Sequence, residues 1–170
     1  MKITIRKEIS ADHTAVHRLN KLAFEQSDEA NLVDALRKKI RPYISLVALL
    51  EDQIVGHIFF SPVTIESESE YFATMGLAPM AVLPEYQKQG IGGKLVKAGL
   101  KECEKFGFDV VVVLGHPEYY PRFGFIPASQ KGLSCEYDVP DEVFMVLELK
   151  EDALKGEQGL VKYHPEFGKV

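Results

Sequence analysis

Residues 87–92 read Gln-Lys-Gln-Gly-Ile-Gly, and they join an apolar run at 80–83 to an amphipathic segment that begins at Ile91. At the start of an α-helix the first backbone N–H groups lack intrahelical partners, and the helix dipole adds partial positive charge. An anion such as a phosphate is therefore stabilised at this end of a helix. Gly90 and Gly92 allow a ligand to approach the backbone closely. The stretch predicts a phosphate-binding loop that opens a helix.

Two common nucleotide-binding motifs do not fit this loop. A dinucleotide fingerprint requires G-x-G-x-x-G, but Leu95 stands at the position of the third glycine. A P-loop requires G-x-x-x-x-G-K-[ST], and here Lys88 replaces the first glycine and Leu95 the hydroxyl residue. Residues 87–92 instead fit the spacing Gln/Arg-x-x-Gly-x-Gly/Ala. The alternative interpretation is an ordinary glycine-rich turn at the start of a helix.

A second stretch of the sequence, residues 110–125, supports the interpretation of the loop. Residues 110–117 read Val-Val-Val-Val-Leu-Gly-His-Pro, and residues 119–125 read Tyr-Tyr-Pro-Arg-Phe-Gly-Phe. Together with the loop, these motifs resemble the GCN5-related N-acetyltransferases (GNAT family), and within them a bacterial branch of predicted acetyltransferases. The resemblance covers roughly residues 45–127 and extends more weakly to both ends of the chain. In this family the loop holds the pyrophosphate of acetyl-CoA.

The resemblance implies an α/β fold in which residues 1–170 form a single N-acetyltransferase domain. Its sheet is mixed and mostly antiparallel, with a splayed parallel strand pair at the centre and helices on both sides. Local patterns predict the same order of elements. These are a strand at 3–5, a helix after Ser10, a helix over 32–40, a hairpin of 45–50 and 54–60 with a turn at 51–53, a polar turn at 65–71, a strand ending at Pro84, a helix from Ile91 closed by Gly107 and a strand at 110–114. The resemblance implies a short helix after this strand that carries Tyr120.

The cofactor site follows from the resemblance. The family's parallel strands separate at a β-bulge, which we expect near residues 80–82, and the pantetheine arm pairs with the exposed backbone. Two kinds of candidate also have a plainer interpretation. Lys88 and Lys94 could simply be solvated, as lysines around a helix commonly are. His116 stands where many relatives carry asparagine, so its alternative interpretation is an ordinary histidine at the end of a strand. The residues expected to contact acetyl-CoA are Met80, Ala81, Val82, Gln87, Lys88, Gln89, Gly90, Ile91, Gly92, Gly93, Lys94 and His116.

Acetyl transfer from a thioester to an amine sets three requirements. The thioester oxygen gains negative charge, and we expect the backbone N–H of Val82 to stabilise it. The departing thiolate needs a proton donor, and Tyr120 occupies the family's tyrosine position, with a core aromatic residue as the alternative interpretation. We expect its neighbour Tyr119 to point elsewhere. For the base, residues 73–80 offer no carboxylate. The resemblance implies that the helical region around Glu29 borders the acceptor side, which makes Glu29 a weaker candidate, although a carboxylate there also suits a helix start.

Other histidines and the cysteines carry little signal. His13 and His17 have the spacing of a metal pair on a helix, but without further ligands we expect no metal site. His57 either faces the acceptor cavity or is a hydrogen-bonded histidine of the sheet. Cys103 and Cys135 fit neither a metal pattern nor a disulfide framework, and neither is an evident acyl-cysteine nucleophile.

Composition excludes several classes of protein. The 170 residues are 46% hydrophobic and 26% charged, which is typical of one globular domain. The net charge of -5 and pI of about 5.6 argue against a nucleic-acid partner. No apolar run reaches the ~18 residues of a membrane span, so we expect no membrane partner. Because the two cysteines suggest no disulfide framework, we expect the protein in a reducing cytoplasm. The strand-like segment at 143–150 suggests a homodimer formed by strand exchange or edge pairing.

The sequence therefore predicts an acetyl-CoA-dependent N-acetyltransferase that needs no metal and transfers acetyl directly to a primary amine in a ternary complex. A non-catalytic acyl-CoA-binding or sensing module is the alternative, because the strand before the loop has no carboxylate. Transfer of a longer acyl chain is a further alternative. The acceptor amine, on a small molecule or a protein, has no recognisable signature in the chain.

Overall fold

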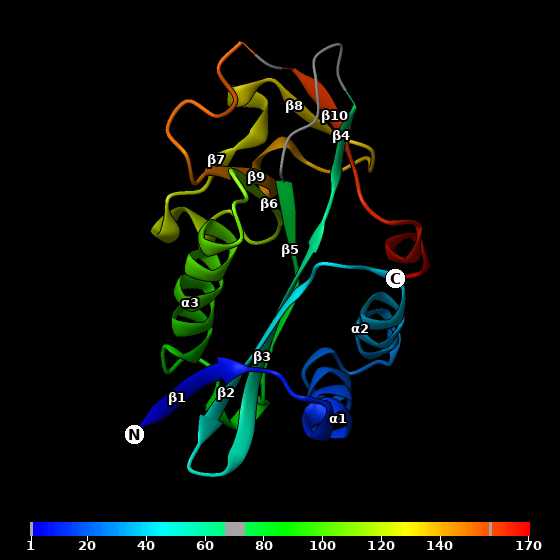
Figure 1. Cartoon of the computed structure of the whole chain (residues 1–170), viewed down its shortest axis with the longest axis vertical. Helices are drawn as coiled ribbons and strands as arrows, with labels where there is room; N and C mark the ends of the chain where they lie inside the picture. Colours follow the sequence, from blue (N-terminus) through cyan, green and yellow to red (C-terminus); the bar gives the residue numbers. More distant parts are fainter. Residues whose placement is uncertain (1, 67–73, 157) are drawn as a thin grey trace.

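The computed structural model of the chain describes residues 2–66, 74–156 and 158–170. At its centre lies a seven-stranded sheet in the order β1-β2-β3-β5-β6-β9-β7 (Figure 1). Only the β5–β6 pair is parallel among the neighbouring strands described in this sheet. The predicted mixed and mostly antiparallel fold class is thus confirmed. The strands are β1 (Ile3–Lys7), β2 (Ile44–Leu50), β3 (Gln53–Pro62), β5 (Thr74–Val82), β6 (Val110–Leu114), β7 (Ile126–Pro127) and β9 (Phe144–Glu148).

Helices cover both faces of this sheet. Figure 1 shows α3 (Ile91–Lys105) on one side of the strands, and α1 (His13–Phe24) with α2 (Asp28–Lys39) on the other. None of the helices in the described part of the chain is both long and apolar enough to cross a membrane. Short 3-10 helices fill the connections: η1 (Ser10–Asp12), η2 (Pro84–Tyr86), η3 (Tyr120–Phe123), η4 (Ala128–Lys131), η5 (Asp141–Val143) and η6 (Pro165–Lys169).

The helix that follows the loop packs very closely on the sheet. Leu95, Gly99 and Cys103 recur on one face of α3 and are buried against the strands. A Cβ atom at Gly99 would lie 2.3 Å and 2.6 Å from two ring atoms of Phe60. The ring of Phe60 therefore fills the space that a side chain at this helical position would need. Gly107, with φ +87°, ends the helix in the left-handed conformation that favours glycine.

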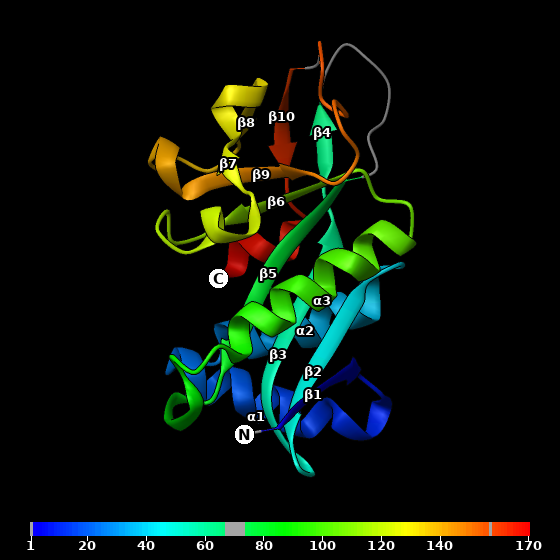
Figure 2. The same cartoon turned by 90° about the vertical axis from the view of Figure 1, so that its left-hand side faces the viewer.

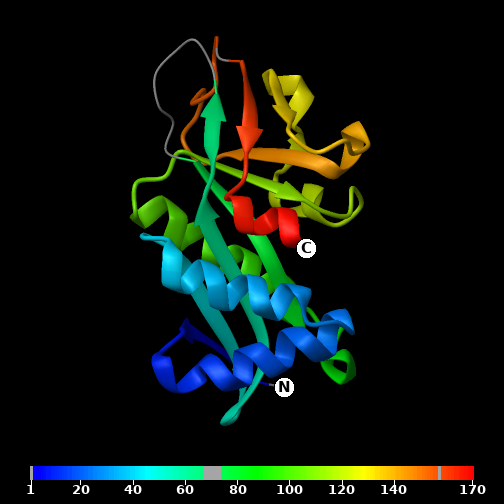
Figure 3. The same ribbon diagram turned by 90° about the vertical axis from the view of Figure 1, so that its right-hand side faces the viewer.

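The central parallel strands separate along their length. β5 and β6 pair from Thr74 with Val110 to Leu77 with Val113, and β5 then continues to Val82 without β6. Figures 2 and 3 view this from opposite sides, and both show the two strands starting together and then diverging. The splayed pair predicted from the family is therefore present. We call the open region beside residues 78–82 of β5 the notch.

The β-bulge lies earlier than expected. Ile58 pairs with Met80 and Phe60 with Leu77, so one residue of β3 lies opposite two residues of β5, Ala78 and Pro79. The expected position near residues 80–82 is thus wrong. A proline is suited to a bulge because it has no N–H to donate to a neighbouring strand.

A second sheet was not predicted. It has three strands in the order β4-β10-β8, formed by Thr64–Glu66, Gly159–Lys162 and Leu133–Cys135. Ile65 and Glu66 therefore belong to a strand and not to the expected polar turn, whose remaining residues, 67–71, lie outside the described residues. The hairpin turn is also shorter than predicted, because Gln53 already belongs to β3.

The segment proposed as a dimer edge lies inside the sheet. β9 pairs with β6 along its length, and its residues Met145 and Val146 also pair with β7 of the same chain. Edge pairing through this part of the strand is therefore wrong as an expectation. Strand exchange and the homodimer itself stay predictions.

A buried polar network joins α1 to the sheet. His57 is fully buried, with Nδ1 3.2 Å from Asn20 Nδ2 and Nε2 2.8 Å from Ser45 Oγ. The hydrogen-bonded sheet histidine is therefore the correct interpretation. Burial, with a smaller contribution from the charge of Arg37, lowers the pKa of His57 to about 3. The imidazole is neutral, accepts from Asn20 and donates to Ser45.

We predict that Gly99→Ala destabilises the protein by about 1–3 kcal/mol, because the new methyl group overlaps the Phe60 ring and the core must shift. Gly93→Ala is the matched control, since the nearest atoms to its Cβ lie 3.7 Å and 3.8 Å away. Urea unfolding at neutral pH measures both effects. Equal stabilities of the two variants would contradict this account of the α3 packing.

We predict that His57 makes the fold sensitive to acid. Between pH 6.5 and pH 3 the unfolded chain binds a proton at His57 that the folded chain does not, so stability falls as the pH falls. From pH 6.0 to pH 4.5 the loss attributable to this residue is about 2 kcal/mol. Urea unfolding of the wild type and of His57→Gln at both pH values measures it. A wild type that loses no more stability than the variant would contradict the prediction.

Candidate active site

The backbone of β5 is open on the side of the notch. Leu83 N–H donates to Val55 O of β3 at 2.9 Å. Because N–H directions alternate along a strand, the N–H of Val82 points away from β3, toward the side on which β6 no longer pairs. This is the orientation that a donor to a ligand in the notch requires.

The loop from Pro84 to Gly90 is shaped by its own side chains and by two positive φ angles. The side-chain amide of Gln87 donates to Val82 O at 2.9 Å, and that of Gln89 donates to Glu85 O at 3.3 Å. Lys88 has φ 63° and Gly90 φ 86°. Gln87 therefore ties the loop to the end of β5, and Gln89 braces the loop internally, which leaves backbone N–H groups and the exposed Lys88 as donors that the loop offers to a ligand.

The start of α3 presents free donors. Its first backbone hydrogen bond runs from Lys94 N–H to Gly90 O at 3.2 Å, so the N–H groups of Ile91, Gly92 and Gly93 lack intrahelical partners. No atom lies within 4 Å of the position of a Cβ atom at Gly90, so a ligand can approach the backbone there. These features match an anion site at a helix N-terminus.

The other residues expected at the cofactor site have different surroundings. Ile91 is buried in the core, which leaves only its backbone for a ligand, and Ala81 pairs with His57 across β5 and β3. Lys88 and Lys94 are exposed beside the loop, and His116 is exposed just after β6. The fold therefore gathers the loop and Met80–Val82 at one end of β5, with His116 following the strand that diverges from it.

Tyr120 lies in the core where β6 ends. It is 7% exposed, and a Cβ atom at Gly115 would lie 2.3 Å from its ring. Its ring makes edge contacts with Tyr119 and Phe125, at centroid distances of 5.1 Å and 5.7 Å. Burial raises the pKa of Tyr120 to about 12, with a smaller effect of Tyr119, so the phenol keeps its proton at neutral pH.

Tyr119 does not point away from the site, contrary to expectation. Its hydroxyl oxygen lies 2.9 Å from the position of a Cβ atom at Gly92, and the methyl carbon of Met80 lies 3.4 Å from the same point. The side chain is half-buried, and burial raises the pKa of its phenol, while the charge of Arg122 opposes this shift. Three segments therefore meet here: β5, the start of α3 and the turn before η3.

Sequence reasoning missed Arg122. Its guanidinium carbon lies 5.3 Å from the centre of the Tyr119 ring, so the side chain brings a cation to the same region. Arg122 lies within residues 119–125, which carry the family resemblance, but the resemblance gives no role to this position.

Glu29 lies in the first turn of α2 and is held by a neighbour. Both carboxylate oxygens accept from Gln26 Nε2, at 2.9 Å and 3.1 Å. Among the described residues no hydrogen bond or ion pair joins Glu29 to Tyr120 or to the loop. These contacts favour the interpretation of Glu29 as a helix-start carboxylate.

The two histidines considered as a metal pair, His13 and His17, each lie beside a carboxylate. His17 Nδ1 lies 2.7 Å from Asp34 Oδ2, and His13 Nε2 lies 3.6 Å from Glu8 Oε1. Within residues 2–66, 74–156 and 158–170, no group of three or more His, Cys, Asp or Glu side chains could hold a metal ion.

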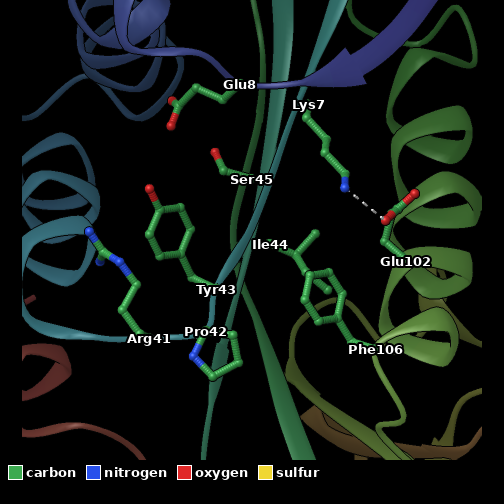
Figure 4. A pocket seen from close by; sticks show the side chains of 9 residues that line it. All are labelled: Lys7, Glu8, Arg41, Pro42, Tyr43, Ile44, Ser45, Glu102 and Phe106. Atoms are coloured by element: carbon green, nitrogen blue, oxygen red, sulfur yellow. Dashed lines mark ion pairs between the residues drawn. The ribbon is translucent and has the colours of Figure 1, made fainter.

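Two pockets lie apart from the notch. One, of about 310 Å³, wraps around the start of β2, and Figure 4 shows Lys7 and Glu102 paired at its rim, 3.8 Å apart. The other, of about 660 Å³, lies between α1 and the end of α2. In it Arg37 pairs with Asp34 and with Glu8. Neither pocket is lined by the loop, Tyr119 or Tyr120.

Comparison with known proteins identifies the family of the chain. Residues 4–128 match the acetyltransferase (GNAT) domain family. The uncharacterized N-acetyltransferase YhbS of Escherichia coli K12 is 39% identical over 166 residues, which cover 97% of this chain and 98% of the relative.

Two crystal structures are similar over almost the whole chain. YhbS from Escherichia coli in complex with CoA has a TM-score of 0.92 and 37% identity, and the match covers 100% of this chain and 94% of that one. A GNAT family acetyltransferase from Brucella melitensis in complex with acetyl-CoA has a TM-score of 0.80 and 35% identity, with 98% of each chain covered. The chain therefore belongs to the GNAT family of acetyltransferases, as its loop and tyrosine motifs predicted.

Proposed function

We propose that this protein is an acetyl-CoA-dependent N-acetyltransferase that holds acetyl-CoA and a primary amine in one ternary complex. The observation that supports the proposal is the meeting of three features: the open edge of β5, the free N–H groups of α3 and the side chain of Tyr119, next to Tyr120 in the chain. The complexes of the two relatives with CoA and acetyl-CoA support it.

The residues present fit this cosubstrate. CoA carries several phosphate charges, and the start of α3 offers N–H groups without partners at Ile91, Gly92 and Gly93. Lys88 and Lys94 add positive charge beside the loop. The amide groups of the pantetheine arm match the open backbone of β5 around Val82. Acetyl-CoA supplies the acetyl thioester when bound.

Two groups of the chain then assist transfer. The N–H of Val82 donates to the thioester oxygen as its negative charge grows, and one such donor is typically worth ~3–4 kcal/mol. Tyr120, protonated at neutral pH, donates its proton to the departing thiolate. The amine attacks the thioester carbon directly, so no acyl group passes through a cysteine. Burial raises the pKa of Cys103 to about 12, which leaves its thiol a poor nucleophile.

The substrate ammonium must lose a proton before its nitrogen can attack, and β5 offers no evident acceptor for that proton. His57 is buried and hydrogen-bonded on both sides, and its low pKa makes it a poor base. We propose that water in the notch carries this proton to solvent, with Glu29 as the remaining carboxylate candidate. The acceptor is a small-molecule or protein amine.

The second candidate function is an acyl-CoA sensor without turnover. The missing carboxylate on β5 favours it, whereas the tyrosine in the family position favours the enzyme. Calorimetric titration with acetyl-CoA, CoA and ATP, followed by a thiol-release screen against pooled amines, separates the two. Acetyl-CoA binding with amine-dependent thiol release supports the transferase, and binding without release supports the sensor. Absence of acetyl-CoA binding would overturn both.

We predict that Gly90→Asp weakens CoA binding about 10- to 100-fold more than Gly90→Asn does. The two side chains have nearly the same shape and both tolerate the left-handed conformation at φ 86°, but only aspartate repels a phosphate. Calorimetry with CoA gives the affinities, and thermal unfolding confirms that both variants fold. Equal affinities of the two variants would remove the assignment of this loop.

We predict that Tyr120→Phe lowers kcat by about 10²–10⁴-fold, with a small change in the affinity for acetyl-CoA, because only the proton donor is lost. The ring and its contacts with Phe125 and Gly115 are kept. Steady-state thiol release and calorimetry measure the two quantities. Full turnover in the variant would show that Tyr120 is only a core aromatic residue.

A further inference from the structure

The hydroxyl group of Tyr119 lies over the first turn of α3. Its oxygen is 2.9 Å from the Cβ position of Gly92, closer than a real Cβ atom would allow, so it occupies the place of a side chain there. Gly92 is the second residue of α3, among the residues whose N–H groups lack intrahelical partners. The side chain of Tyr119 thus reaches from the turn after β6 across to the phosphate loop.

The ring of Tyr119 is held in this position from several sides. Tyr120 and Phe123 meet it edge-on, at centroid distances of 5.1 Å and 5.3 Å and interplanar angles of 88° and 65°. The guanidinium of Arg122 lies 5.3 Å from its centre. Aromatic edge contacts of this kind restrict ring orientation, so the hydroxyl is positioned before a ligand arrives.

Donors gather at this point without an acceptor. Within the described residues the Tyr119 hydroxyl makes no hydrogen bond, and Arg122 makes no ion pair. The N–H groups of Gly92 and Gly93 lie in the same turn of α3. The hydroxyl and the two amide groups belong to half-buried residues, and the exposed guanidinium of Arg122 lies beside the tyrosine ring. Such a set of donors indicates an anionic ligand, and two linked phosphates offer several acceptor oxygens.

We propose that Tyr119 is a cofactor-positioning residue whose hydroxyl donates a hydrogen bond to the pyrophosphate of CoA at the start of α3, with Arg122 placing positive charge beside it. This inference rests on the proposed function of the notch. It gives the adjacent tyrosines separate tasks, since Tyr119 binds the phosphate end of the cosubstrate and Tyr120 serves the thiol end.

Gly92 makes the proposal testable. The loop motif allows either glycine or alanine at this position, so alanine is compatible with phosphate binding by the loop itself. In this chain, however, a methyl group at Gly92 would displace the Tyr119 hydroxyl. In Tyr119→Phe the clashing oxygen is gone, and the next atom, the methyl carbon of Met80, lies 3.4 Å away. The effect of Gly92→Ala therefore depends on the tyrosine hydroxyl.

The experiment is a double-mutant cycle measured by calorimetric titration with CoA. Tyr119→Phe and Gly92→Ala are each expected to weaken CoA binding about 10-fold, as for the loss of one hydrogen bond to a charged group. The double variant is expected to bind about 10-fold, not 100-fold, more weakly than the wild type. Tyr137→Phe, which loses a phenol in the region of the three-stranded sheet, is expected to bind CoA as the wild type does.

Each other outcome contradicts the inference. Wild-type affinity in Tyr119→Phe would show that the hydroxyl makes no contact with CoA, and independent effects in the double variant would show that Gly92 acts without it. Thermal unfolding of every variant separates loss of binding from loss of fold. If the folded wild type itself fails to bind CoA, the proposed function fails, which is a different result from a failure of Tyr119 alone.

Discussion

β6 pairs with β5 from Thr74 to Leu77 and then turns away, so the backbone of β5 from Met80 to Val82 is hydrogen-bonded to β3 alone. A strand inside a sheet normally satisfies both of its edges, because unpaired backbone groups away from water are costly. The open edge therefore has to be covered by water or by a ligand. Val82 lies in this open segment, and the glutamine that fixes the loop binds its carbonyl group.

The part of β6 that pairs with β5 is buried on both faces. Val111 and Val113 are buried in the core beneath α3, whereas Val110 and Val112 are buried against residues of the three-stranded sheet. β6 extends only to Leu114, one residue beyond its last pair with β5, whereas β5 continues to Val82. The second sheet, remote from the loop in the chain, thus packs against the strand that borders the notch.

Local signals predicted much of this architecture and failed where distant segments decide it. The run of valines at 110–113 identified β6, because a continuous apolar run is typical of a buried strand. The glycines at 90 and 107 identified both ends of α3, because each adopts a positive φ angle that favours glycine. The bulge was placed too late, although Pro79 marks its true position. The three-stranded sheet was missed because its strands are three or four residues long and come from three separate regions. Periodicity is too weak a guide at that length.

The site itself was predicted in part for the same reason. The loop motif located the residues at the end of β5 and the start of α3. It could not give the direction of Tyr119, since adjacent residues in a tight turn point to different sides and only the packing of Phe123 and Tyr120 decides which. Glu29 was suggested by its position in the family's acceptor region, but its contact with Gln26 could not be read from spacing.

The contact between Gly99 and Phe60 has a further consequence for the loop. Because the ring occupies the only side-chain space at that level of the helix, α3 cannot slide along the sheet by a turn without driving a side chain into the ring. Gly99 lies eight residues after Ile91, or about 12 Å along the helix axis. Gly99 thus fixes the position of α3 along its axis, and with it the distance between the free N–H groups of the first turn and the N–H of Val82. That distance determines how long a ligand must be to contact both.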